Sequence, residues 1–393
     1  MADSAESLTT PAAATLSSLR QLTVSRRSAL LGAAALFSTV TPRALLAAVP
    51  PDPSPPTPSV ILLNGNENPY GPSPTARQAI IRSVFESCRY GDQAIKTLMQ
   101  AIAAYDQLTI EHLILGSGSS ELLRMSAFLA AEGGSGGEVI AATPTYEELP
   151  DFATRLGLQV ITVPLNAQHQ HDLPAMQAAI TDKTRLIYIC NPNNPTATVV
   201  GLKALEDFMR AVPARTRVLI DEAYFDFITD SSAGSVISWV KTYQNLIVTR
   251  TFSKIHGLAG LRIGYAYAHP TLAAQLTAKQ LAYPNIAGLR AALASLTDSA
   301  FIHSTRTVLL ADRARIEDCI DRLGLTRTRS QGNFVFFDVR QPLAEFSKKM
   351  LAHHIAVGRH FTGYDQWARI TVGLTSEVNH LLTALPHALS TSG

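Results

Sequence analysis

Residues 245–264, NLIVTRTFSKIHGLAGLRIG, are the stretch on which the interpretation of this sequence depends. The apolar, β-branched run from Leu246 to Val248 predicts a buried strand that ends near Thr251. Lys254 follows in the loop after that strand, where α/β proteins commonly carry functional side chains. A partly buried lysine beside cationic groups has a lowered pKa, and its neutral amine can attack a carbonyl carbon. Lys254 is therefore a candidate nucleophile.

Three neighbours of Lys254 are suited to binding an anion. The hydroxyl groups of Thr251 and Ser253 and the guanidinium of Arg262 can together donate several hydrogen bonds to one phosphate or carboxylate. A lysine after a strand is more often a solvated surface residue, so this stretch does not establish a catalytic site by itself.

Length and composition indicate a globular protein that acts on small molecules. The chain has 393 residues, 46% of them hydrophobic and 16% charged, enough for a large core and two domains. The net charge is +2 and the basic residues are scattered, so neither nucleic acid nor an anionic membrane surface is an expected partner. The cysteines Cys88, Cys190 and Cys319 show no metal-binding spacing and are interpreted as buried thiols, and no metal is expected.

The N-terminal region resembles a leader that directs export. Arg26 and Arg27 precede a mildly apolar, Ala-rich run, an arrangement typical of a twin-arginine signal peptide over residues 1–48. That run is too short to predict a stable membrane anchor. Residues 49–58 are rich in proline and predict an extended linker. The expected location is the periplasm, and the alternative is a cytoplasmic protein with an N-terminal extension.

Beyond the linker, short apolar runs alternate with helical patterns, which predicts an α/β fold with a mostly parallel sheet covered on both faces. The large domain is expected over residues 86–289, and a smaller α+β domain over 59–85 and 290–393. The predicted strands of the sheet and its neighbours cover residues 59–63, 113–115, 139–141, 160–163, 186–190, 218–220 and 246–248, and helices are expected over 75–87, 96–105, 120–132 and 202–212.

Polar residues follow three other predicted strands. Gly118 lies in LGSGSSE (115–121), whose glycines let backbone amides converge on an anion at a helix N-terminus. Asn194 lies in NPNNPT (191–196), which taken alone is equally an ordinary turn. Asp221 ends a buried strand, where a carboxylate requires a cationic partner.

One ligand, pyridoxal 5′-phosphate, has groups that suit all of these strand ends. Its phosphate suits the turn at Gly118 and the Arg262 guanidinium, its ring nitrogen suits Asp221, and its aldehyde would form a Schiff base with Lys254. Lys254, Asp221 and Tyr224 are the predicted catalytic residues, with Tyr146 stacked on the ring. The residues expected to bind the cofactor are Gly118, Ser119, Ser120, Tyr146, Asn194, Asp221, Tyr224, Thr251, Ser253, Lys254 and Arg262.

The motifs appear in the order found in one enzyme family. With NGNENPYG (64–71), they make residues 60–390 resemble the fold-type-I, pyridoxal-phosphate-dependent aminotransferases of class I/II, and among them the histidinol-phosphate aminotransferases. The resemblance implies a mostly parallel seven-stranded sheet in the large domain and a homodimer in which Tyr90 reaches the neighbour's cofactor phosphate. It also implies that Arg369 grips the substrate α-carboxylate. The expected substrate-binding residues are Tyr70, Asn194, Arg359 and Arg369.

Two positions depart from that family. Ala197 stands where glycine is usual, which predicts a reshaped turn or a negative φ at this residue. Gly91 stands where proline is common.

The function expected from these features is transfer of an amino group between an amino acid, or an amino-acid moiety of an exported peptide, and a 2-oxo acid. Two alternatives remain open within the same fold: a Cα-decarboxylase or lyase, and a histidinol-phosphate aminotransferase proper. A cofactor-binding regulator is disfavoured, since no DNA-binding pattern precedes the fold.

Overall fold

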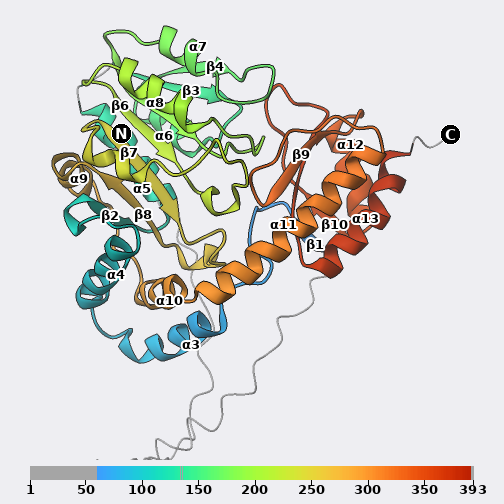
Figure 1. Cartoon of the computed structure of the whole chain (residues 1–393), viewed down its shortest axis with the longest axis horizontal. Coiled ribbons are helices and arrows are strands. Elements are labelled where there is room, and N and C mark those ends of the chain that lie inside the picture. Colours follow the sequence, from blue (N-terminus) through green and yellow to red (C-terminus); the bar gives the residue numbers. More distant parts are fainter. Residues whose placement is uncertain (1–59, 133, 135, 391–393) are drawn as a thin grey trace, which may run out of the picture. The chain divides into compact units, whose positions relative to one another are not determined.

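The computed structural model describes residues 60–132, 134 and 136–390 (Figure 1). The predicted signal peptide (1–48) and linker (49–58) lie outside the described residues. Among the helices that are described, none combines the length and the apolar character needed to cross a membrane.

A seven-stranded sheet forms the centre of the larger part of the fold, in the order β2-β8-β7-β6-β5-β3-β4. All neighbours from β7 to β4 run parallel, whereas β8 is antiparallel to both β7 and β2. This confirms the predicted mostly parallel sheet. The strands are β2 (Leu113–Gly116), β3 (Glu138–Thr143), β4 (Gln159–Pro164), β5 (Thr184–Cys190), β6 (Arg217–Asp221), β7 (Leu246–Thr251) and β8 (Gly264–Ala268).

Successive residues of each central strand enter two different cores. Ile187 of β5 packs on one face of the sheet, and its neighbours Leu186 and Tyr188 pack on the other. Both faces are therefore apolar, which explains the continuous apolar runs in the sequence. One face is covered by α5 (Ser119–Ala131), α6 (Glu148–Arg155) and α9 (Pro270–Thr277), and the other by α4 (Asp92–Tyr105), α7 (Leu173–Ala178), α8 (Leu202–Ala211) and α10 (Ile286–Thr297).

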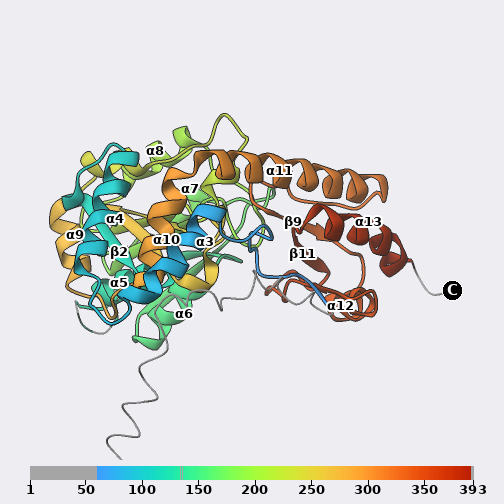
Figure 2. The ribbon, with the colours of Figure 1, turned by 90° about the horizontal axis from the view of Figure 1, so that it is seen from below.

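The C-terminal elements lie together (Figure 2), and their apolar side chains make up most of a separate core. Helix α11 (Ser299–Arg322) begins where the side chain of Asp298 accepts a hydrogen bond from the amide of Phe301. It packs with α12 (Leu343–Ala352) and α13 (Thr375–Leu389) around two small sheets. In these sheets β9 (Phe334–Asp338) pairs antiparallel with β11 (Trp367–Thr371), and β1 (Ile61–Leu63) pairs parallel with β10 (Ile355–Val357).

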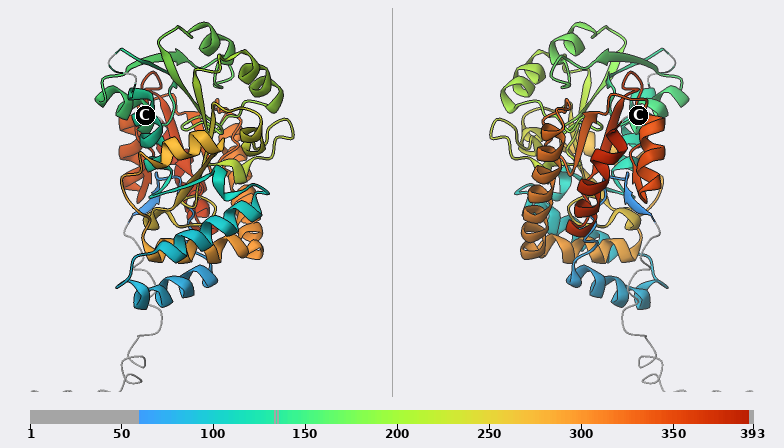
Figure 3. Two further views of the ribbon diagram at one scale, coloured as in Figure 1. Left: turned by 90° about the vertical axis from the view of Figure 1, so that its left-hand side faces the viewer. Right: turned by 90° about the vertical axis from the view of Figure 1, so that its right-hand side faces the viewer.

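The segment predicted to join the small domain, residues 59–85, is divided between the two parts. Strand β1 pairs with β10 of the C-terminal part. Helix α3 (Pro74–Ser83) instead contacts α10 and contributes Ala76 to the core of the large sheet, and Figures 1 and 3 show α3, α4 and α10 side by side.

One buried arginine connects three segments beneath the ends of the central strands. Arg250 of β7 forms ion pairs with Asp106, 3.2 Å away after α4, and with Glu222, 3.0 Å away after β6. Its guanidinium also lies 4.3 Å from the centre of the Phe225 ring. Both carboxylates are buried, so their charges depend on this one cation.

Arg250→Met should lower the free energy of unfolding by about 3–5 kcal/mol at pH 7, because it leaves two buried carboxylates without their cation. Burial already raises the pKa of Asp106, and loss of Arg250 raises it further, so protonation should make the deficit smaller at pH 5 than at pH 7. Urea unfolding at both pH values measures this. Arg215→Met is the control, since Arg215 pairs with the exposed Asp182. Equal losses in the two variants would contradict the prediction.

Candidate active site

The ends of several strands open on a cavity of about 260 Å³. Parallel strands bring their carboxyl ends to one edge of the sheet, so residues far apart in the sequence meet there. Twelve of the predicted site residues line this cavity: Ser119, Ser120, Tyr146, Asn194, Asp221, Tyr224, Thr251, Ser253, Lys254, Arg262, Arg359 and Arg369.

Lys254 lies in the loop after β7, as expected. Its Nζ donates a hydrogen bond to the carbonyl oxygen of Gly65 at 3.4 Å and lies 5.3 Å from the centre of the Tyr224 ring. Burial lowers the pKa of Lys254 to about 8, and the positive charge of Arg369 acts in the same direction. Near neutral pH a much larger share of this amine is therefore neutral, and nucleophilic, than of an exposed lysine, although the charged form still predominates.

Asp221 ends β6 and is only 2% exposed. Its Oδ1 accepts hydrogen bonds from Thr249 Oγ1 at 2.9 Å and from the amide of Ala223 at 3.2 Å, and the Tyr188 hydroxyl donates to Oδ2 at 3.4 Å. Among the described residues, no lysine or arginine forms an ion pair with it, and burial raises its pKa to about 6. A cationic ligand atom beside Asp221 would stabilise its charged form.

The turn before α5 is shaped to bring an arginine close to backbone amides. Gly118 has φ +82°, and no side chain caps the helix that follows. A Cβ atom at Gly118 would lie 2.2 Å from Nη2 of Arg262, and one at Gly264 would lie 2.4 Å from the amide nitrogen of Ser119. Only glycine permits both approaches. Free first-turn amides beside a guanidinium form an anion site.

The hydroxyl groups predicted to complete this anion site lie beside it. Arg262 Nη2 donates to Ser120 Oγ at 3.4 Å. Thr251 Oγ1 donates to Ser253 Oγ at 2.9 Å, and both residues are buried. The four side chains thus line one wall of the cavity.

Arg369 presents a second, more deeply buried guanidinium. Its Nη1 donates to Asn194 Oδ1 and its Nη2 to the carbonyl oxygen of Asn64, both at 2.6 Å. Its Nε has no hydrogen-bond partner among the described residues. The rings of Phe334 and Phe361 lie 5.7 and 5.3 Å from its Cζ. A carboxylate ligand would satisfy this unpaired donor and offset the cost of burying the charge.

Two tyrosines complete the walls of the cavity. The Tyr224 hydroxyl accepts a hydrogen bond from Asn66 Nδ2 at 3.1 Å, and burial raises its pKa. Burial also raises the pKa of Tyr146, although a hydrogen bond with Ser120 opposes this. Tyr224 is therefore positioned as a neutral hydrogen-bond donor, and Tyr146 as an aromatic surface.

Sequence reasoning missed several lining residues, among them Gly65, Asn66 and Glu67. They lie within the 64–71 motif, directly after β1. Polar residues that follow an apolar strand are a pattern from which they could have been predicted. The amide of Asn66 donates to Thr371 Oγ1 at 2.9 Å, so β11 holds this segment in place. Contacts between segments so far apart in the sequence leave no pattern in the sequence itself.

Three predicted site residues do not line this cavity: Gly118, which shapes the turn before α5, Tyr70 and Tyr90. The Tyr70 hydroxyl lies 3.4 Å from Thr375 Oγ1. Tyr90 is 96% exposed and lies beside Phe85 and Arg89. Since Tyr90 was expected to reach a neighbouring subunit, its role stays a prediction.

Two expectations from the sequence are wrong. Ala197 has φ +56°, so the turn keeps a left-handed residue and is not reshaped for alanine. The amide of Ala197 donates to the carbonyl oxygen of Asn193, and its carbonyl oxygen accepts from the amide of Gln331, both at 2.7 Å. These hydrogen bonds fix the left-handed conformation and offset its strain of about 1–2 kcal/mol. Cys88 is exposed because it lies in the turn before α4, whereas Cys190 and Cys319 are buried as predicted.

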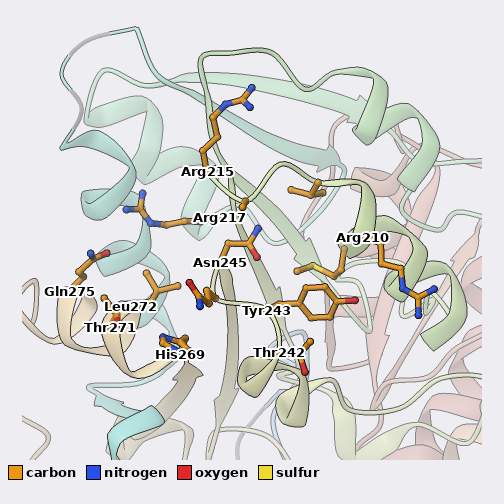
Figure 4. A pocket seen from close by; sticks show the side chains of 14 residues that line it. Arg210, Arg215, Arg217, Thr242, Tyr243, Asn245, His269, Thr271, Leu272 and Gln275 are labelled. Atoms are coloured by element: carbon orange, nitrogen blue, oxygen red, sulfur yellow. The ribbon is translucent and has the colours of Figure 1, made fainter.

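A larger cavity, of about 530 Å³, lies at the opposite ends of the same strands (Figure 4). Arg217 begins β6 there, Asn245 precedes β7, and His269 follows β8. None of the predicted site residues lines it. The described part of the chain also contains no cluster of His, Cys, Asp and Glu suited to a metal ion. The smaller cavity therefore remains the candidate active site.

Comparison with known sequences gives the same answer. The family model "Aminotransferase class I and II" matches residues 58–385. A histidinol-phosphate aminotransferase of Moorella thermoacetica is 37% identical over 335 residues, which cover 84% of this chain and 86% of the relative. An aromatic amino acid aminotransferase of Rhodococcus jostii is 38% identical over 322 residues, or 81% of this chain and 88% of the relative.

Solved structures with the same fold include two of this type. A putative histidinol-phosphate aminotransferase from Erwinia carotovora atroseptica has a TM-score of 0.80 and 32% identity, covering 84% of this chain and 95% of that chain. The histidinol-phosphate aminotransferase of Sinorhizobium meliloti, solved in complex with pyridoxal-5′-phosphate, has a TM-score of 0.79 and 26% identity, covering 90% of this chain and 98% of that chain.

These matches confirm the predicted fold-type-I architecture, the aminotransferase activity and, through the family, the predicted cofactor, pyridoxal 5′-phosphate. The chain belongs to the class I and II aminotransferase family.

Proposed function

We propose that Lys254 holds pyridoxal phosphate covalently in this aminotransferase, and that the enzyme moves an amino group between an amino acid and a 2-oxo acid. The observation that carries the proposal is the meeting of three groups in one cavity. These are an amine with a pKa of about 8, a buried carboxylate that forms no ion pair with any described residue, and an anion site of backbone amides and a guanidinium.

The residues present fit this cofactor group by group. The phosphate would take the first-turn amides of α5 with Arg262, and Asp221 would meet the ring nitrogen. When bound, the cofactor ring withdraws electrons from the substrate Cα atom. The remaining groups would fix its position: Thr251, Ser253 and Ser120 at the phosphate, Asn194 and Tyr224 at the ring oxygen, and Tyr146 at the ring face.

Two side chains would act on the substrate itself. Arg369, with Asn194, would bind and orient the α-carboxylate. The amine of Lys254, once free of the cofactor, would remove the proton from the substrate Cα atom and would deliver a proton to the cofactor carbon that had carried the aldehyde oxygen. Arg369 favours transamination over decarboxylation, because it would retain the carboxylate that a decarboxylase expels.

The amino donor is proposed to be a free amino acid or an amino-acid moiety of an exported peptide. The names of the similar proteins, histidinol-phosphate and aromatic amino acid aminotransferases, support a donor with a planar ring. Histidinol phosphate itself remains the second candidate. The proposed location, the periplasm, argues for the first, because histidine synthesis is cytoplasmic.

A homodimer with shared active sites is also proposed. Exposed apolar side chains, which are costly in a monomer, support a subunit contact: Phe85, Tyr90, Leu281 and Tyr283 are each more than 60% exposed. Tyr90 would then reach the phosphate in the neighbouring subunit.

Lys254→Ala should lose at least about a thousandfold in transamination, because it removes both the covalent attachment and the proton carrier. The assay uses 2-oxoglutarate as the amino acceptor and tests phenylalanine, histidine, glutamate, histidinol phosphate and peptides with a free amino group as donors. It also measures the release of carbon dioxide. The matched control is Lys203→Ala, since Lys203 is exposed on α8 and pairs only with Asp207. Wild-type rates in Lys254→Ala would refute the assignment, and carbon dioxide release would indicate the decarboxylase.

Lys254 should react with acetic anhydride at lower pH than other lysines do. Its labelling in the apoprotein, followed by mass spectrometry, is expected to be half-maximal at about pH 8, against about 10.4 for exposed lysines. Substituting Arg369 with leucine should move the midpoint upward, because Arg369 is a charge that lowers this pKa. A midpoint shared with the exposed lysines would contradict the burial argument.

The proposed export depends on Arg26 and Arg27. Replacing both with lysine should leave the protein in the cytoplasm, because twin-arginine transport requires the pair. Cell fractionation measures the distribution, and Arg20→Lys is the control within the same leader. Equal periplasmic amounts of the double variant and the wild type would eliminate this route.

A further inference from the structure

Arg359, the third arginine that lines the active-site cavity, already forms an ion pair with a carboxylate. Both terminal nitrogens of Arg359 donate to the carboxylate of Glu147, one of them to Oε1 at 3.4 Å. The guanidinium also stacks on Phe361, 4.4 Å from the ring centre. Glu147 directly follows Tyr146, so the pair joins the C-terminal part of the fold to the aromatic wall of the active-site cavity.

Arg359 and Arg369 therefore differ in how much of their charge is available to a ligand. Arg369 is buried and its hydrogen-bond partners are neutral oxygens, so it keeps a full charge for a ligand. Arg359 is 51% exposed and shares its charge with Glu147, which is 39% exposed. A ligand anion would bind at Arg369 without competition, but it would have to replace Glu147 at Arg359.

Beside Glu147 there is space into which its carboxylate could move, whereas the neighbouring carboxylate, Glu148, is already paired and does not take its place at Arg359. A hollow of about 200 Å³ adjoins the active-site cavity and shares Tyr146 and Arg359 with it. Glu148, the next residue, is held by Arg124 at 2.6 Å. Glu147 is thus the carboxylate that pairs with Arg359, and its side chain lines a hollow with room for another position.

We propose that Glu147 sets the side-chain preference of the enzyme by occupying Arg359. The inference rests on the proposed function and deepens it. Substrates with uncharged side chains leave the Glu147–Arg359 pair intact. Substrates that carry a side-chain carboxylate or phosphate must break this pair to reach Arg359. The free energy of the Glu147–Arg359 pair is then subtracted from their binding free energy. Exposed pairs of this kind correspond to a discrimination of about two- to fivefold.

Calorimetry with two unreactive acids tests the proposal on the enzyme with its cofactor. Glutarate has a second carboxylate, whereas 3-phenylpropanoate has an apolar side chain. Glu147→Gln should tighten glutarate binding about two- to fivefold and leave the binding of 3-phenylpropanoate unchanged. Glu148→Gln is the matched control, because it removes the neighbouring carboxylate and leaves Arg359 paired.

The catalytic arm of the test uses kcat/KM. In Glu147→Gln, kcat/KM for glutamate and histidinol phosphate should rise about two- to fivefold relative to that for phenylalanine. In an Arg359→Ala background, Glu147→Gln should have no such effect, because the two residues act as one unit.

Three outcomes would overturn the role of Glu147: parallel changes for both acids, the same shift in Glu148→Gln, or a shift that persists without Arg359. A glutarate affinity that is the same in Glu147→Gln as in the wild type would also overturn it. A wild-type protein that moves no amino group from any donor would instead refute the proposed function, and the calorimetric ratio would still decide the role of Glu147.

Discussion

Burial of one negative charge at the end of a strand organises this structure. Asp221 can remain in the interior only because its neighbours in the sheet supply donors, Tyr188 from β5 and Thr249 from β7. The pairing places Cys190 and Thr249 directly opposite Asp221. A shift of one residue would turn the carboxylate to the opposite face of the sheet. The register of three parallel strands therefore fixes the point around which the remaining groups of the cavity are arranged.

Much of this arrangement could be predicted because buried parallel strands leave an unambiguous pattern. Asp221 and Lys254 follow continuous apolar runs, so their place at the sheet edge was expected. Strand β8, with the sequence GYAYA, was missed because its small residues give no such run. The left-handed turn at Ala197 was also misjudged, because hydrogen bonds to distant segments override the intrinsic preference of alanine.

The contacts that sequence reasoning could not reach are those between segments far apart in the chain. Glu147 and Arg359 are separated by 212 positions, and neither residue type indicates the other. The division of residues 59–85 between β10 and α10 likewise depends on packing partners chosen in three dimensions. Predicting such pairs needs the fold first, whereas strand ends can be recognised from local pattern alone.

The short strand β1 has a consequence for how the cavity opens. It is three residues long, pairs only with β10 among the described strands, and leads directly into Gly65, Asn66 and Glu67. Hydrogen bonds nevertheless tie this segment to the C-terminal part: Asn66 donates to Thr371, and Asn333 and Arg369 donate to the carbonyl oxygens of Glu67 and Asn64. This wall of the cavity therefore opens only when these bonds break together with the β1–β10 pairing, so the amides of β1 should exchange hydrogen with those of the C-terminal part and not ahead of them.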